Sequence, residues 1–111
     1  LVEFDQIKNK FDLIVSNPPY IDKNQYKNLH IEIKNFEPKI ALFGGDDGLK
    51  FYKLFASKIE KLMNKNSYFV FEIGYNQSKS CQDIFSKTDL VLLKISKDIQ
   101  KIDRTLTFLK I

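Results

Sequence analysis

The sequence has very few of the residues that hold metal ions or form covalent cross-links. Its 111 residues include one cysteine, Cys81, one histidine, His30, and no tryptophan. A lone cysteine excludes an intrachain disulfide framework and a zinc site built from clustered cysteines. A lone histidine argues equally against a histidine-rich zinc site.

Long apolar runs are also absent. No run approaches the ~20 residues that a bilayer-spanning helix needs. The first five residues, LVEFD, have neither the basic region nor the long apolar stretch of a secretory signal peptide. We therefore expect no membrane partner and a cytoplasmic location, or an organellar matrix in a eukaryote. Because the chain begins with Leu1 rather than methionine, we expect it to be a fragment of a longer protein.

The composition is that of a globular domain. Hydrophobic residues make up 43% of the chain and charged residues 29%, with only 4 glycines and 3 prolines, which argues against a disordered tail. The net charge of +4 would allow a nucleic-acid partner. The lysines are scattered, however, and no block of five like charges occurs, so direct nucleic-acid binding is not expected.

The hydrophobic patterns predict an α/β fold. An apolar run that stops at the prolines after residue 16 favours a buried strand. The expected strands span residues 11–16, 67–73, 90–96 and 105–111, the expected helices residues 49–63 and 77–87, and residues 21–47 form an irregular segment with one short helix. This order favours a helix-covered sheet whose last two strands form an antiparallel hairpin.

The most informative stretch is Asn17, Pro18, Pro19 and Tyr20. Because it follows a buried strand, it lies at the carboxyl edge of the sheet, where ligands bind. Two prolines stiffen the turn and leave carbonyl groups without local donors. The Asn17 amide oxygen and the Pro18 carbonyl can both accept from one planar NH2 group, and Tyr20 can stack on its plane. The pattern predicts a pocket for an amide or aromatic amine, with catalysis mostly by positioning.

Three segments of the chain resemble one family. Residues 11–21 (FDLIVSNPPYI) resemble motif IV of the amino-group methyltransferases that use S-adenosylmethionine. Residues 36–49 (FEPKIALFGGDDGL) resemble the segment after this motif in peptide chain release factor glutamine methyltransferases, also called protein-(glutamine-N5) methyltransferases. Residues 71–77 (FEIGYNQ) resemble the next strand and turn of the same family.

The C-terminal residues extend the resemblance. Asp98, Asp103 and Arg104 are similar to the family's closing hairpin, although Lys101 stands where the family usually has glycine. The resemblance identifies residues 1–111 as part of a catalytic domain, from just before motif IV to the C-terminus. It implies an α/β fold: the C-terminal half of a Rossmann-like class I methyltransferase sheet, ending in an antiparallel hairpin.

The resemblance also implies a reaction. A methyl group would pass from S-adenosylmethionine to the side-chain amide nitrogen of the glutamine in the Gly-Gly-Gln loop of a peptide chain release factor. Asn17 and Pro18 would accept hydrogen bonds from that amide, Pro19 would shape the turn, and Tyr20 would pack against the amide plane. Asn17 would also lie beside the methyl donor. For Glu37, we expect either a role in the site or a role in bracing a loop.

Several parts of the family's enzyme have no match in this chain. The Gly-rich cofactor loop after the first strand, the acidic residue that ends the second strand, and the N-terminal helical domain are absent from the sequence. In the family's sheet the fourth strand lies beside the first, so we expect the edge of the strand at residues 11–16 to be open. We therefore expect marginal stability and little or no cofactor affinity for the chain alone.

Three alternatives remain open. A DNA adenine methyltransferase would use the same pocket on a flipped base, but residues 36–38 and 46–49 and the lack of a DNA-recognition insert disfavour it. A ribosomal-protein glutamine methyltransferase is a closer relative, which residues 72–75 disfavour moderately. The third alternative is a non-catalytic remnant without cofactor. Among single residues, we expect His30 at the surface, Cys81 in the core and Arg104 bracing the hairpin.

Overall fold

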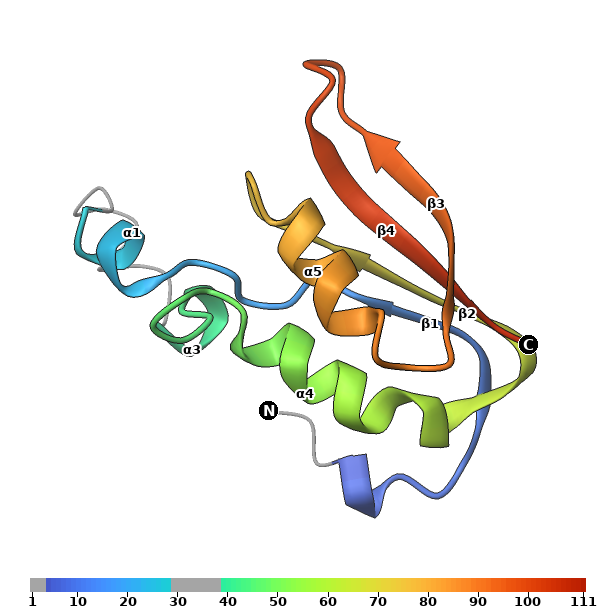
Figure 1. Ribbon diagram of the computed structural model, residues 1–111. Helices are drawn as coiled ribbons and strands as arrows, with labels where there is room; N and C mark the ends of the chain where they lie inside the picture. Colours follow the sequence, from blue (N-terminus) through green and yellow to red (C-terminus); the bar gives the residue numbers. More distant parts are fainter. Residues whose placement is uncertain (1–3, 29–38) are drawn as a thin grey trace.

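The computed structural model describes residues 4–28 and 39–111, so His30 and Glu37 lie outside the described residues. Figure 1 shows the arrangement of the elements. They are η1 (Phe4–Gln6), β1 (Phe11–Ser16), α1 (Lys23–Lys27), α3 (Lys39–Leu42), α4 (Lys50–Lys58), η2 (Ile59–Leu62), β2 (Met63–Glu72), α5 (Ser78–Phe85), β3 (Val91–Lys97) and β4 (Asp103–Lys110). None of the helices in these two ranges is long and apolar enough to cross a membrane.

The strands form one mixed sheet with the order β1-β2-β4-β3. The outer strand β1 pairs with β2 in parallel, and β4 runs antiparallel to both of its neighbours. The predicted hairpin of the last two strands is therefore confirmed. The parallel pair brings the carboxyl ends of β1 and β2 to the same edge of the sheet.

The core lies between one face of this sheet and the helices α4 and α5 (Figure 1). Aromatic rings dominate it. Phe85 of α5 stacks on Phe108 of β4 with 4.7 Å between ring centroids and on Phe71 of β2 at 5.2 Å. Phe69 lies between Phe71, at 4.9 Å, and Phe55 of α4, at 5.5 Å. Such offset and edge-on ring pairs add to the stabilisation that burial itself provides.

The first long helix ends earlier than its sequence pattern predicts. The apolar spacing favours a helix over residues 49–63, but α4 ends at Lys58, a short 3-10 turn follows, and Met63 already belongs to β2. The Nζ of Lys110 donates to the carbonyls of Glu60, at 2.8 Å, and Met63, at 3.0 Å, and so joins the 3-10 turn η2 and the start of β2 to the end of β4. Met63 is fully buried as the first residue of β2, and the hydrophobicity that the sequence reports for it is the same for a buried strand as for a buried helix face.

Two acidic residues precede this helix. The side chains of Asp46 and Asp47 could accept from the first helical N–H groups. The structure has Leu49 at the N-cap without a side-chain cap, and Asp47 Oδ1 accepts from the N–H of Leu49, at 2.9 Å, one position earlier. Asp47 also pairs with Lys53 on the first turn.

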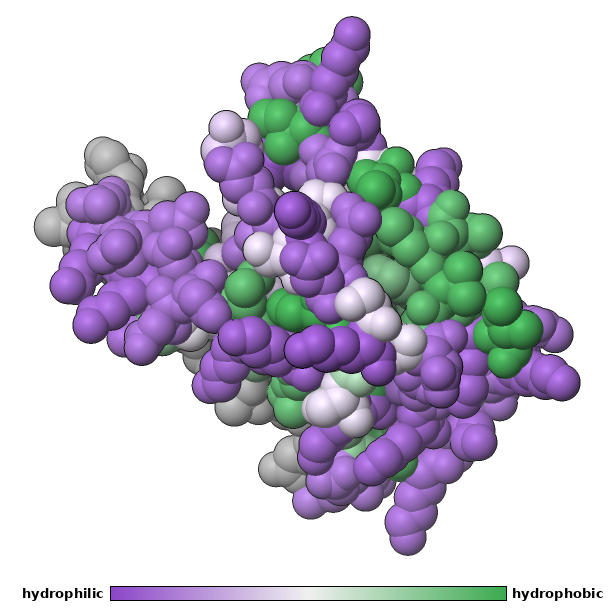
Figure 2. Space-filling model, viewed as in Figure 1, coloured by the Kyte–Doolittle hydropathy of each residue, from purple (hydrophilic) through white to green (hydrophobic). Residues whose placement is uncertain are grey.

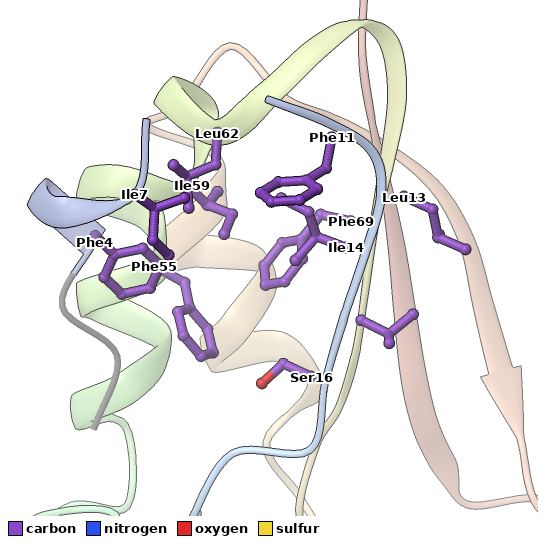
Figure 3. Close-up of a pocket in the computed structure, with 11 residues that line it drawn as sticks. Phe4, Ile7, Phe11, Leu13, Ile14, Ser16, Phe55, Ile59, Leu62 and Phe69 are labelled. Carbon is purple, nitrogen blue, oxygen red and sulfur yellow. The ribbon is translucent and has the colours of Figure 1, made fainter. Parts of the chain in front are cut away.

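The outer strand β1 has an open edge, as predicted. No other strand of the described residues pairs with its free side, and Phe11, Leu13 and Val15 are 40%, 59% and 67% exposed. Figure 3 shows that Phe11 and Ile14 of β1 point toward an apolar cavity against α4, with Leu13 on the other side of the strand. The cavity has a volume of about 300 Å³.

Apolar side chains are exposed on the hairpin as well. Figure 2 shows a hydrophobic area on the side of the molecule where β3 and the C-terminus lie. Val91, Leu93 and Ile111 are 44%, 55% and 70% exposed. Together with Leu13 and Val15, they show that the described elements leave a substantial part of the apolar surface uncovered, a feature that marks interfaces or aggregation risk.

The loop of the closing hairpin is organised by Asp98. Its Oδ1 accepts from the N–H groups of Gln100, at 2.8 Å, and Ile102, at 3.1 Å, and its Oδ2 accepts from Nε of Arg104, at 3.0 Å. The hydrogen bond from Ile102 and then the Arg104 guanidinium hold the pKa of Asp98 below its ordinary value. Arg104 therefore braces the hairpin, as expected from the sequence.

Lys101 occupies a backbone conformation that suits glycine. Its φ of +63° lies in the left-handed region, which explains why the resembling family usually has glycine there. We expect Lys101→Gly to raise the free energy of unfolding by about 0.5 kcal/mol, because relief of the left-handed strain outweighs the added freedom of glycine in the unfolded chain. Thermal unfolding should show a midpoint raised by about 3 °C. The control Lys94→Gly, within β3, should lower it; a similar loss in Lys101→Gly would contradict the prediction.

Candidate active site

The 17–20 turn (Asn-Pro-Pro-Tyr) lies directly after β1, at the edge of the sheet where β1 and β2 both end. This is the predicted position. In an open α/β sheet, the carboxyl ends of parallel strands form the edge at which ligands bind. A hollow of about 280 Å³ opens beside Asn17, between the last residues of β1 and β2 and the start of β4.

The turn presents two acceptors to the surroundings. Asn17 is exposed, Pro18 is buried, and Pro19 and Tyr20 are half-buried. Across residues 4–28 and 39–111, no group donates a hydrogen bond to the Asn17 side chain or to the Pro18 carbonyl. Both oxygens can therefore accept from an incoming NH2 group. An exposed asparagine whose side chain has no hydrogen-bond partner among the described residues is the kind of residue that a ligand would use.

Backbone pairing holds the chain immediately after the turn. Ile21 donates its N–H to the carbonyl of Leu42, at 3.1 Å, and accepts from the N–H of Gly44, at 2.8 Å. Gly44 lies so close that an added Cβ would be 2.7 Å from the Pro19 carbonyl oxygen and 2.8 Å from the Cα of Tyr20. The glycine at position 44 is thus required by the approach of the turn.

The ring of Tyr20 packs over Gly74, just after β2. A Cβ at Gly74 would be 2.5 Å from Cδ2 of Tyr20. This contact orients the ring and makes it part of the wall at the sheet edge. The half-buried ring retains exposed surface, so a role against a bound amide is compatible with its position.

Sequence reasoning missed the side chain that reaches the turn. Gln77, at the N-cap of α5, donates from Nε2 to the Tyr20 carbonyl at 3.0 Å. Its Oε1 accepts from the N–H of Gly74, at 2.8 Å. The only signal in the sequence was its place three residues after Gly74 in the segment that resembles the family.

Neither Cys81 nor a cluster of metal-ligating side chains adds to the site in the described residues. Cys81 is fully buried on α5, and burial raises the pKa of its thiol to about 12, so it stays a neutral core residue, as expected. Groups of three or more His, Cys, Asp or Glu side chains that could hold a metal ion are not found among the described residues.

The described residues do not fit S-adenosylmethionine by themselves. Asn17 is the one residue that the sequence assigns to the donor, and its hollow is otherwise lined mainly by Val15, Val70 and Phe71 together with Ser16, Glu72 and Thr105. The acidic side chain of Glu72 is exposed at the rim rather than enclosed. The part of the chain with known placement therefore supplies at most one side of a donor pocket.

Comparison with known proteins gives the family. A family model described as "Eco57I restriction-modification methylase" matches residues 1–104. The chain belongs to this methylase family. Among curated proteins, the release factor glutamine methyltransferase of Fusobacterium nucleatum is 44% identical over 97 residues, which are 87% of this chain and 27% of that enzyme. The bifunctional methyltransferase of Rickettsia bellii is 43% identical over 99 residues, or 89% of this chain and 18% of that protein.

Two solved methyltransferase structures have the same fold as this chain. A methyltransferase from Pyrococcus furiosus superposes with a TM-score of 0.62 at 15% identity, over 94% of this chain and 43% of that one. A protein-(glutamine-N5) methyltransferase from Alicyclobacillus acidocaldarius superposes with a TM-score of 0.58 at 23% identity, over 91% of this chain and 49% of that one. The predicted resemblance and the predicted partial Rossmann-like methyltransferase fold are therefore confirmed. The chain spans about one fifth to two fifths of the length of the curated relatives it matches.

Proposed function

We propose that this chain is part of an S-adenosylmethionine-dependent enzyme that methylates the side-chain amide nitrogen of the glutamine in the Gly-Gly-Gln loop of a peptide chain release factor. Residues 1–111 would form the part of its catalytic domain that binds the glutamine. One observation carries the proposal: at the carboxyl edge of the sheet, neither the amide of the exposed Asn17 nor the carbonyl of the buried Pro18 accepts a hydrogen bond from a described residue.

The turn suits a carboxamide substrate. A primary amide presents two N–H donors in one plane, and the Asn17 and Pro18 oxygens would accept one each. Pro19 fixes the turn, and Tyr20 would cover the amide plane. Two acceptors would hold the nitrogen in one orientation. S-adenosylmethionine, when bound, would supply the methyl group with cleavage of its methyl–sulfur bond, and the amide would release one proton to solvent. Such catalysis depends on positioning and electrostatics rather than on a strong base.

The relatives favour a release factor over the alternatives. Curated proteins that match 86–96% of this chain at 37–44% identity are named release factor glutamine methyltransferases or bifunctional methyltransferases. The family description names a restriction-modification methylase, so a nucleic-acid substrate is the competing proposal. Among the described residues that line the hollow beside Asn17, none is a lysine or an arginine. A release factor substrate would place the protein in the cytoplasm or an organellar matrix.

A chimeric enzyme tests the proposal. The segment of the Fusobacterium nucleatum enzyme that matches this chain would be replaced by residues 1–111, and the product incubated with S-adenosylmethionine and its release factor. We expect mass spectrometry to find one added methyl group on the glutamine of the Gly-Gly-Gln loop. A release factor with glutamate in place of this glutamine should gain none. Methyl transfer to a DNA duplex instead, or none by a folded chimera, would refute the proposed function.

A further inference from the structure

The carboxamide of Gln77 joins three separate segments at the sheet edge. Nε2 donates to the carbonyls of Tyr20, at 3.0 Å, and Gly48, at 3.3 Å. Oε1 accepts from the N–H of Gly74, at 2.8 Å, and lies 3.1 Å from the hydroxyl of Tyr52. Both hydrogens of the amide are therefore used, Gly74 occupies one acceptor site, and the Tyr52 hydroxyl lies within hydrogen-bond distance of the second.

The neighbouring backbone leaves room for this one side chain. A Cβ at Gly48 would be 2.9 Å from Nε2 of Gln77 and 2.5 Å from the Tyr20 carbonyl oxygen. A Cβ at Gly74 would be 3.0 Å from Oε1 of Gln77. The two glycines thus let the carboxamide reach the carbonyl that it binds.

Tyr52 supports the carboxamide from the core. It is fully buried, and its hydroxyl can donate its hydrogen to Oε1 of Gln77 or to the Glu72 carbonyl, at 3.2 Å. Burial raises the pKa of Tyr52, so the hydroxyl remains a neutral donor. This fixes which end of the Gln77 amide faces the core and which faces Tyr20.

The turn cannot hold itself in place. Pro18 and Pro19 have no N–H to donate. Among the described residues, Gln77 is the one that makes a hydrogen bond to residues 18–20, through the Tyr20 carbonyl. The orientation of Asn17 and Pro18 toward a substrate therefore depends in part on a side chain that lies 57 positions from Tyr20 in the sequence.

From these contacts we infer that Gln77 is a positioning residue: its Nε2 holds the Tyr20 carbonyl and thereby aims the Asn17 and Pro18 oxygens at the substrate amide. The inference depends on the proposed function only for the identity of the substrate amide. The position of the turn itself can be measured without any substrate.

The substitution Gln77→Glu separates the two ends of the side chain. It keeps the shape and the acceptors for Gly74 and Tyr52, but it places a carboxylate oxygen against the Tyr20 and Gly48 carbonyls. The matched control is Gln82→Glu in the same helix, where Nε2 donates only to Ser78 Oγ, at 3.0 Å. NMR spectra of the full 111-residue chain report the Asn17 side-chain amide and the Tyr20 ring, with Phe108 as the reference for an intact core.

At neutral pH, Gln77→Glu should shift and broaden the Asn17 and Tyr20 resonances, whereas Gln82→Glu should not. As the pH falls toward the ordinary Glu pKa of about 4.3, the introduced carboxyl gains a hydrogen that it can donate to the Tyr20 carbonyl, and the resonances should return toward those of the wild type. Loss of general packing would give no such recovery.

In the chimera, Gln77→Glu should lower kcat by about tenfold, the factor that corresponds to one ordinary hydrogen bond, with the KM for the donor unchanged. If the wild-type chimera transfers no methyl group, the proposed function fails, and the NMR comparison still decides the role of Gln77. Should Gln77→Glu not fold, Tyr52→Phe should shift the same resonances by less. Turn resonances identical to the wild type in the folded variant would overturn the inference.

Discussion

Asn17→Ala is expected to lower methyl transfer by the chimera by about two to three orders of magnitude, the loss typical of removing one preorganised hydrogen-bonding group from an active site. The free energy of unfolding should change by less than about 0.5 kcal/mol, as for surface substitutions away from structural contacts. Methyl transfer and the free energy of unfolding are expected to respond differently because Asn17 is exposed and no described residue donates to its side chain.

The measurement is methyl incorporation into the release factor, together with a thermal unfolding curve for each variant. Asn9→Ala is the matched control, because Asn9 is also exposed and lies just before the same strand. It should leave both transfer and stability unchanged. If Asn17→Ala retained more than a tenth of the wild-type rate, the assignment of Asn17 to the substrate amide would be wrong.

The second large effect is expected for Gly44→Ala. A methyl group there would lie 2.7 Å from the Pro19 oxygen, 2.8 Å from the Tyr20 Cα and 2.9 Å from the Gly48 oxygen, all of them backbone atoms. Because backbone atoms cannot move away individually, we expect a loss of about 1–3 kcal/mol in the free energy of unfolding. Denaturant titration of the chain measures this loss. Methyl transfer by the chimera should also fall, since the 17–20 turn is displaced.

Gly45→Ala distinguishes displacement of the turn from simple backbone strain. Gly45 has a φ of +92°, and the three atoms nearest to its added methyl group would all belong to the side chain of Lys50. This variant should therefore lose stability, by about 1–2 kcal/mol from its left-handed conformation, without moving the turn. Equal transfer rates for the two variants, once both are folded, would contradict the role given to Gly44.

Much of the fold could be predicted because the decisive signals are local. The prolines after Ser16 end β1, and the short link after Lys97 specifies the closing hairpin. The position of the 17–20 turn followed from the same reasoning, since a motif after a parallel strand lies at the carboxyl edge. The sequence also showed that Lys101 replaces the glycine usual in the resembling family, and the structure shows a positive φ at this residue.

The remaining features depend on contacts between distant residues. The start of β2 is held partly by Lys110, which lies 47 residues from Met63 and donates to its carbonyl. Gln77 has an ordinary sequence environment at the start of a helix, and only the folded chain brings it to Tyr20. Periodicity reports which residues are buried, but it does not report which polar groups meet.

The strand order β1-β2-β4-β3 has a consequence for the way the chain folds. The β3–β4 hairpin closes a loop of only residues 98–102, whereas β1 can pair with β2 only after residues 17–62 have been brought together. Closing a longer loop costs more chain entropy, and sheets with such distant pairings form slowly. The outer strand β1, which carries the 17–20 turn, is therefore expected to join the sheet last. Assembly of the edge proposed to bind the substrate is then one of the final events in folding.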